Sequence, residues 1–117
     1  MIDGLVALRS EIGAFYRGDG RPDNLRRAFR QALLIVPLTD DEQVWMASIG
    51  GIQWVWAFST TIELGKYQAS HDDMSGGRFI TVPGWRLEAA GGLPTCVVVD
   101  VEGEYPMSFP PALSATL

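Results

Sequence analysis

The chain has 117 residues, of which 47% are hydrophobic and 20% are charged, and its formal net charge is −5. This composition is typical of a folded domain and excludes a disordered chain. No apolar run reaches the roughly 20 residues that cross a bilayer. The single cysteine excludes an internal disulfide. We therefore expect one domain over residues 1–117, with residues 1–32 helical and residues 33–113 forming a sheet core, and no membrane partner.

The charge is divided unevenly along the chain. Residues 1–30 carry six arginines against four acids, whereas residues 31–117 carry three basic residues against ten acids. An acidic body argues against a nucleic-acid partner, because nucleic acid requires a basic surface. The first residues, MIDGLVALRSEIGAFY, contain neither a basic leader nor a long apolar block. This predicts a cytoplasmic protein and leaves a signal-less export route open.

Two helices are predicted before the first strand. Between Ile2 and Arg17, apolar residues repeat at spacings of three and four, which predicts an amphipathic helix; they are Leu5, Leu8, Ile12 and Phe15. The stretch Gly18-Asp19-Gly20 ends this helix, and Pro22 suits the first turn of the next one.

The second helix has a basic outer face. Leu25, Phe29 and Ala32 form its inner face, and three arginines lie opposite them: Arg26, Arg27 and Arg30. Two interpretations are open. The arginines form a patch that binds an acidic partner, or they form a solvated helix face close to the negative C-terminal end of the helix dipole.

Three strands follow, and they carry most of the apolar residues. Leu33–Leu38 is an unbroken apolar run, as in a strand covered on both faces. After an acidic turn, Val44–Ile49 and Ile52–Phe58 flank Gly50-Gly51, which is a strong signal for a two-residue hairpin turn. This turn sets Ile49 opposite Ile52, Ala47 opposite Trp54 and Trp45 opposite Trp56.

One face of this hairpin is therefore aromatic. Side chains alternate across a strand, so Trp45, Trp54, Trp56 and Phe58 share a face. Either helices cover this face and its tryptophans belong to the core, or it is partly exposed and binds a protein partner or a second copy of the chain. Stacking on nucleic-acid bases would require a basic surround, which this region lacks.

The rest of the chain predicts short elements that alternate between helix and strand. Thr60-Thr61-Ile62-Glu63 reads as a capping box that opens a helix of about ten residues. The later elements are a polar loop at His71–Gly77, a strand at Arg78–Val82, a short helix at Trp85–Ala90 that ends at Gly91-Gly92, a central strand at Cys96–Val101, an edge strand at Tyr105–Phe109 and a last turn at Pro110-Pro111. The sequence predicts an α+β fold with two N-terminal helices followed by a mixed sheet of about five strands with short crossover helices.

The order of these segments resembles the SseB N-terminal domain family, a family of small bacterial domains. The matching segments are LLIVPL (33–38), WVWAFSTTIEL (54–64), VPGWRLEAA (82–90), CVVVDVEG (96–103) and FPPAL (109–113). The resemblance covers roughly residues 28–113. It implies an α+β fold, no established enzyme activity and a link to secretion.

The residue types that carry chemistry are few. His71-Asp72-Asp73 lacks the further donors of a metal site, so we expect no metal and no cofactor. Cys96 with His71 as its base would make a catalytic dyad, but a cysteine that opens a valine-rich strand is usually a small buried residue. Asp100 is either a perturbed carboxylate in a site or a strand-end residue that meets solvent or a helix N-terminus.

Three hypotheses follow, and the sequence favours the first. The chain is a non-enzymatic interaction module that uses the aromatic face, and secondarily the three arginines, to bind a protein or itself. Alternatively it is a small-molecule-binding protein or an enzyme with a site near His71, Cys96 and Asp100. A weaker hypothesis is an acidic, secretion-associated protein that masks a basic effector.

Overall fold

The structure is a computed structural model, and it describes residues 4–71, 78–88 and 94–111. Helices α1 (Gly4–Tyr16) and α2 (Pro22–Gln31) pack against each other at the N-terminal end. The apolar spacing correctly predicted their inner faces, because Leu8, Ile12, Leu25 and Phe29 are buried. Pro22 opens α2, where its missing N–H costs no hydrogen bond.

Six strands form two sheets, which confirms the α+β class. A two-stranded sheet pairs β1 with β4, and a four-stranded sheet has the order β2-β3-β5-β6. The strands are β1 (Leu33–Pro37), β2 (Met46–Ile49), β3 (Ile52–Ala57), β4 (Phe79–Pro83), β5 (Thr95–Val99) and β6 (Met107–Phe109). The predicted single sheet of about five strands is thus divided into two sheets, which isolated bridges connect at Ile35–Phe58, just after β3, and at Leu38–Val44, just before β2.

Strand β1 is covered on both faces, as its apolar run predicted. Its first residue, Leu33, is exposed, and the four residues that follow are buried. Leu34 and Val36 belong to the main core with α1 and α2, whereas Ile35 packs with Phe58, Leu64 and Tyr67 under the next helix. Ile35 and Phe58 exchange backbone hydrogen bonds of 2.9 and 2.8 Å, which tie the two sheets together.

The hairpin between β2 and β3 has the predicted register as far as Met46. Ile49 pairs with Ile52 and Ala47 with Trp54, across Gly50 and Gly51, which both have positive φ. The expected pair of Trp45 with Trp56 lies outside this ladder. Trp45 instead donates its backbone N–H to Pro37 O at 3.1 Å, so the chain bends toward β1 before β2 begins.

Helix α3 (Thr61–Ser70) follows β3 and starts the crossover to β5. Thr60 caps it, because its hydroxyl accepts a hydrogen bond from Glu63 N at 3.2 Å. The capping box is only half formed, since Glu63 Oε1 pairs with Lys66 Nζ at 3.0 Å. Strand β4 and helix α4 (Gly84–Leu87) complete the crossover, and β5 then runs parallel to β3.

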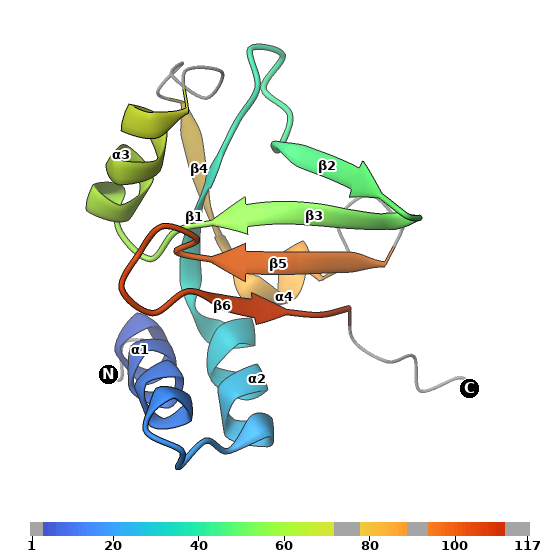
Figure 1. Cartoon of the computed structure of the whole chain (residues 1–117). Helices are drawn as coiled ribbons and strands as arrows, with labels where there is room; N and C mark the ends of the chain where they lie inside the picture. Colours follow the sequence, from blue (N-terminus) through green and yellow to red (C-terminus); the bar gives the residue numbers. More distant parts are fainter. Residues whose placement is uncertain (1–3, 72–77, 89–93, 112–117) are drawn as a thin grey trace.

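The predicted order of the last strands is confirmed. Strand β5 is central between β3 and β6, and β6 is an edge strand. The four-stranded sheet faces the viewer in Figure 1, with α1, α2, α4, β1 and β4 below or behind it and α3 at one end. Parts of three predicted elements lie outside the described residues: most of the polar loop (72–77), the last residues of the predicted helix Trp85–Ala90 with the glycines after it (89–93), and the chain after Pro111.

Candidate functional site

The two faces of the four-stranded sheet differ in how far the rest of the chain covers them. None of the residues of β2, β3, β5 and β6 is charged. One face lies against the helices and β1 in the main core; its members include Met46, Val55, Ala57, Val97, Val99, Met107 and Phe109. No helix or strand of the described chain covers the other face (Figure 1). We call this second face the open face.

The open face follows from strand alternation and register. It contains Ala47, Ile49, Ile52, Trp54, Trp56, Cys96, Val98 and Ser108. Ile49 is 64% exposed and Ser108 is exposed, Trp54 and Val98 are half-buried, and the small Cys96, which pairs with Trp54, is buried. Strands with one solvated face normally alternate apolar with polar residues, and here seven of the eight side chains are apolar. Such a face is typical of a surface that another molecule covers.

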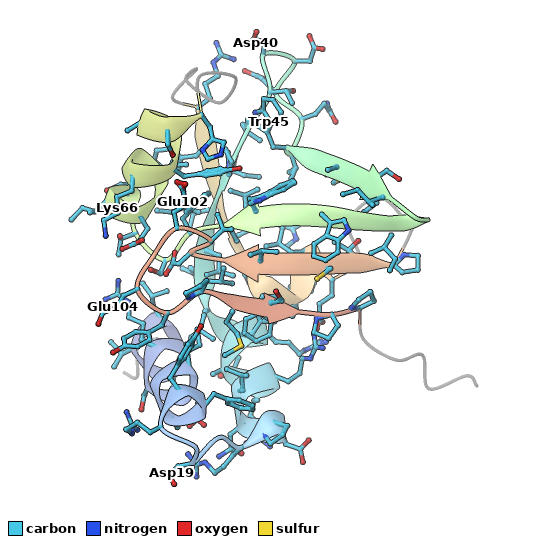
Figure 2. All side chains as sticks on the ribbon, viewed as in Figure 1. Asp19, Asp40, Trp45, Lys66, Glu102 and Glu104 are labelled. Atoms are coloured by element: carbon cyan, nitrogen blue, oxygen red, sulfur yellow. The ribbon has the colours of Figure 1, made fainter. Side chains whose placement is uncertain are left out.

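The aromatic residues predicted on this face separate into two groups. Phe58 is fully buried under α3, so it belongs to the core although it shares the strand face. Trp45 and Trp56 are half-buried and pack against that same cluster. The Trp45 indole also donates to Leu38 O at 3.1 Å, near the crossing from β1 to β2 (Figure 2).

Trp54 is the aromatic residue of the open face that packs against neither core cluster. It pairs with Ala47 on β2 and with Cys96 on β5, in the middle of the sheet. Its Nε1 is buried and has no hydrogen-bond acceptor in the described part of the chain. An indole N–H normally finds a partner when it is buried. The ring is therefore held by packing alone.

The arginine face is largely tied up within the fold. Arg26 Nη1 lies 2.9 Å from Glu88 Oε2, and Arg30 pairs with the other oxygen of the same carboxylate. Arg26 also donates to Pro110 O at 2.9 Å. Arg27 is exposed and makes no ion pair within the described residues. These contacts connect α2 to the end of α4, an arrangement that neither of the two interpretations of the arginines described.

His71, Cys96 and Asp100 do not share a cavity. Cys96 and Asp100 lie at opposite ends of β5, roughly 13 Å apart along an extended chain. His71 lies at the end of α3, where its ring stacks on Tyr67 at 3.9 Å. Burial raises the pKa of the Cys96 thiol, and the charge of Arg26 opposes this in part. A buried thiol with a raised pKa is a poor nucleophile.

Asp100 is a strand-end residue, as one of its two interpretations predicted. It has a positive φ of 53°, and both its carboxylate oxygens accept hydrogen bonds from Ser59, from the backbone N at 2.8 Å and from Oγ at 2.7 Å. Ser59 comes directly before the N-cap of α3. Asp100 therefore fastens the end of β5 to the start of the crossover helix.

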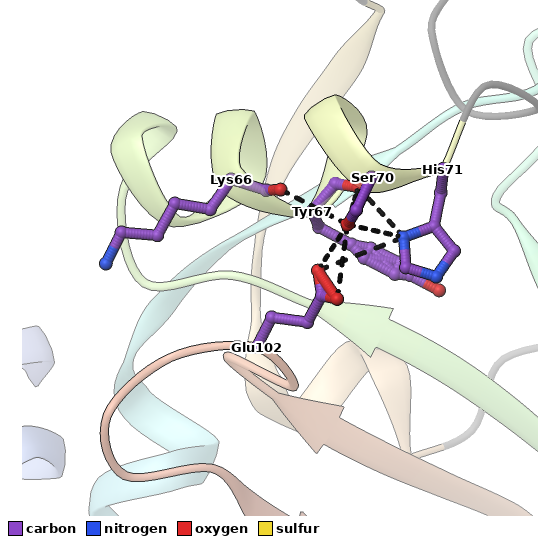
Figure 3. A network of polar contacts seen from close by, with 5 residues as sticks. All are labelled: Lys66, Tyr67, Ser70, His71 and Glu102. Carbon is purple, nitrogen blue, oxygen red and sulfur yellow. Dashed lines mark hydrogen bonds and ion pairs between the residues drawn. The ribbon is translucent and has the colours of Figure 1, made fainter.

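A serine, a histidine and a carboxylate do meet at the end of α3 (Figure 3). Ser70 Oγ donates to Glu102 Oε2 at 2.7 Å and lies 3.0 Å from His71 Nδ1. Glu102 lies 3.9 Å from that same Nδ1. A catalytic triad requires the serine and the acid on different ring nitrogens, so that the imidazole can pass a proton between them. This network instead closes the helix against the β5–β6 loop.

No group of three or more metal-ligating side chains gathers in residues 4–71, 78–88 and 94–111. No helix in these ranges is both long and apolar enough to cross a membrane. No protein-family model, no curated protein and no solved structure matches this chain. The SseB-like resemblance therefore stays a prediction.

The sequence analysis missed part of the open face. It placed Ile49 and Ile52 on the face of the tryptophans, but it did not extend that face to Cys96 and Val98 on β5 or to Ser108 on β6. The alternation in each strand could have identified them, once β5 was set beside β3. The remaining tryptophan, Trp85, lies on α4 and is 49% exposed, away from this face.

Proposed function

We propose that this protein is an interaction module, rather than an enzyme, and that the open face is its binding surface. The observation that carries this proposal is the absence of charge from all four strands of a sheet that no described element covers on one side. Exposed apolar surface of this kind is costly in water unless a partner covers it. Half-buried Trp54 at its centre has the properties of an interface anchor.

The partner that fits this face best is a second copy of the chain. Each copy has a net charge of −5, so two copies repel each other in most orientations. Two open faces can meet without bringing like charges together, because their strands carry none. Two sheets pack face to face at about 10 Å with interleaved side chains, and a two-fold axis allows the same patch to serve both copies.

The other hypotheses receive less support. The site near His71, Cys96 and Asp100 lacks a shared cavity, and Arg26 and Arg30 are engaged with Glu88. The SseB-like family, the link to secretion and the cytoplasmic location remain predictions from the sequence. Nothing in the described contacts favours any of them over the open face.

The test is a concentration series by sedimentation equilibrium with a matched pair of variants. Ile49→Glu places a charge on the open face, at a side chain that is 64% exposed. Ile62→Glu makes the same change on α3, at a side chain that is 71% exposed and lies off this face. We expect a dimer for the wild type and for Ile62→Glu, and a monomer for Ile49→Glu.

Two results would overturn the proposal. A wild type that is monomeric up to about 1 mM would show that a second copy does not bind usefully. A dimer that Ile49→Glu leaves intact would place self-association elsewhere on the molecule. Circular dichroism of both variants confirms that the fold survives.

A further inference from the structure

Strand β4 has one edge that pairs with no other strand of the described chain, and we call it the free edge. The two-stranded sheet ends with β4, and residues 79–81 are exposed. The opposite edge of the same sheet, on β1, is in use. Ile35 exchanges backbone hydrogen bonds with Phe58, and Pro37 O accepts one from Trp45 N. The two edges of this sheet therefore differ in whether their backbone groups have partners.

The register of β1 and β4 shows which groups lie at the free edge. Leu38 N donates to Arg78 O at 2.9 Å, so Arg78 and every second residue after it face β1. The residues between them face outward, because antiparallel pairs alternate between those that exchange hydrogen bonds and those that do not. The free edge thus presents the N–H and C=O groups of Phe79 and Thr81 and the C=O of Pro83. None of these groups has a backbone partner among the described residues.

Apolar side chains accompany these backbone groups. Phe79 is 41% exposed, Ile80 is 38% exposed, and Trp85, two residues after the strand, is 49% exposed. Proteins usually protect a free edge with charged side chains, bulges or a covering element, but no residue of β4 is charged. An uncharged and exposed edge is the kind of surface to which an extended peptide adds as a further strand.

The end of the free edge at Phe79 is negatively charged. The loop between β1 and β2 reaches this end of β4, and it carries Asp40, Asp41 and Glu42, all exposed (Figure 2 labels Asp40). Arg78 is their counter-charge, with its Nη1 2.8 Å from Glu42 Oε1. Three acids and one base leave a local charge of −2 at this end.

The other end of the free edge, at Pro83, is positively charged. Helix α4 follows Pro83 directly, and its exposed Arg86 makes no ion pair with the described residues. The guanidinium carbon of Arg86 lies 5.8 Å from the centroid of the Trp85 ring, a cation–π contact that leaves its N–H groups available. Glu88 does not compete for Arg86, because two arginines of α2 already share its carboxylate.

We propose that the free edge of β4 binds an extended segment of another protein, which adds as an antiparallel strand. The charges fix the chemistry of this segment. It has an uncharged centre, an acidic residue at its N-terminal end beside Arg86, and a basic residue at its C-terminal end beside Asp40 and Asp41. Antiparallel pairing is the more stable kind, and β4 already makes it with β1. The proposal is independent of the open face, which contains no residue of β4.

A second copy of the chain fits the free edge less well than such a segment. A two-fold pair of β4 strands that uses the outward groups of Phe79 and Thr81 in both copies sets Ile80 opposite Ile80. The same register sets the half-buried Val82 of each copy opposite the charged Arg78 of the other. A charge that loses water against an apolar side chain costs free energy. A peptide can place uncharged residues at both positions.

The test uses the peptide acetyl-Glu-Thr-Val-Thr-Val-Thr-Lys-amide and measures amide hydrogen exchange in ¹H–¹⁵N spectra. Without peptide, the N–H groups of Phe79 and Thr81 should exchange fast, whereas those of Ile80 and Val82, which face β1, should be protected. Peptide at about ten times its Kd should slow exchange at Phe79 and Thr81 about tenfold. Protection of these two amides before peptide is added would overturn the proposal, as would an unchanged pattern at about 5 mM peptide.

Three variants and a second peptide locate the binding. Thr81→Pro removes the central outward N–H and should abolish binding, and an edge strand tolerates proline where the N–H faces solvent. Arg86→Gln should weaken binding about threefold. Arg17→Gln is the matched control, because it makes the same charge change near Asp19, at the opposite end of the molecule from Asp40 (Figure 2). The charge-exchanged peptide, acetyl-Lys-Thr-Val-Thr-Val-Thr-Glu-amide, should bind about tenfold more weakly to the wild type.

The contrary results are equally specific. Unchanged binding to a folded Thr81→Pro would place the peptide elsewhere. Equal binding of the two peptides, or equal losses in Arg86→Gln and Arg17→Gln, would remove the charge complementarity and overturn the choice of partner. A dimer of Ile49→Glu that the addition of Thr81→Pro abolishes would show that a second copy occupies the free edge instead. A failed peptide test leaves the proposal for the open face standing, because none of its residues is changed.

Discussion

The two faces of the four-stranded sheet are built from similar residues, yet the described residues cover only one of them. Val97 on the inner face is 1% exposed and packs in the main core, whereas its neighbour Val98 is half-buried on the open face. The hydrophobic effect acts equally on both, because it depends on area rather than on direction. The difference shows that the described residues bury one side of this sheet and leave the other side uncovered.

The difference in burial between the two faces is tested most strongly by placing the same charge on each face in turn. Val97→Asp buries a carboxylate with no partner, and we expect a loss of about 4 kcal/mol or more in the free energy of unfolding. Val98→Asp should cost roughly 1 kcal/mol and keep the fold. Urea denaturation followed by circular dichroism measures both.

A loss of this size in the free energy of unfolding can exceed the total stability of a domain and leave Val97→Asp unfolded. Two alanine variants at the same positions therefore provide a second measurement. Val97→Ala should lose about 2 kcal/mol, and Val98→Ala clearly less. At a protein concentration too low for self-association, equal losses at the two positions would mean that one chain covers both faces to the same degree, and the distinction between them would fail.

The packing behind the inner face can be tested at Gly84, where α4 meets α2. A Cβ at this position would lie 2.0 Å from the backbone O of Phe29, and backbone cannot move away cheaply. We expect Gly84→Ala to lose about 3 kcal/mol in thermal or urea unfolding. Gly65→Ala, in the open on α3, is the matched control and should gain about 0.5 to 1 kcal/mol. A tolerated Gly84→Ala would contradict the close contact of the two helices.

The smallest expected effect concerns the arginine face. Glu88→Gln removes the carboxylate that Arg26 and Arg30 share, and we expect a loss of about 1 kcal/mol that shrinks at high salt. Arg27→Ala should leave stability unchanged, because Arg27 makes no ion pair in the described chain. Unchanged stability in Glu88→Gln would mean that the ion pairs with Glu88 do not stabilise the fold. All three arginines would then be free to bind a partner.

Local signals in the sequence predicted much of the fold. Gly50-Gly51 set the hairpin register because a two-residue turn needs positive φ at both positions. The apolar spacing found the inner faces of α1 and α2, and Thr60 was correctly placed as a helix cap. Each of these features depends on residues within a few positions of one another.

The features that the sequence did not predict depend on distant contacts. Trp45 leaves the hairpin because its backbone N–H donates to the carbonyl oxygen of Pro37 on β1. Phe58 is core rather than surface because α3 folds back over it. The free edge of β4 is defined by the pairing of β4 with β1, and no local pattern connects these two distant segments.

The central claim is that the open face is where this protein meets its partner, and the indole N–H resonances test it most directly. Trp54 lies in the middle of that face and Trp85 lies off it on α4, and both can be followed in one ¹H–¹⁵N spectrum. Between about 10 µM and about 1 mM protein, we expect the Trp54 signal to shift with concentration while the Trp85 signal stays in place. A Trp54 signal that does not move over this range, or a shift confined to Trp85, would contradict the claim.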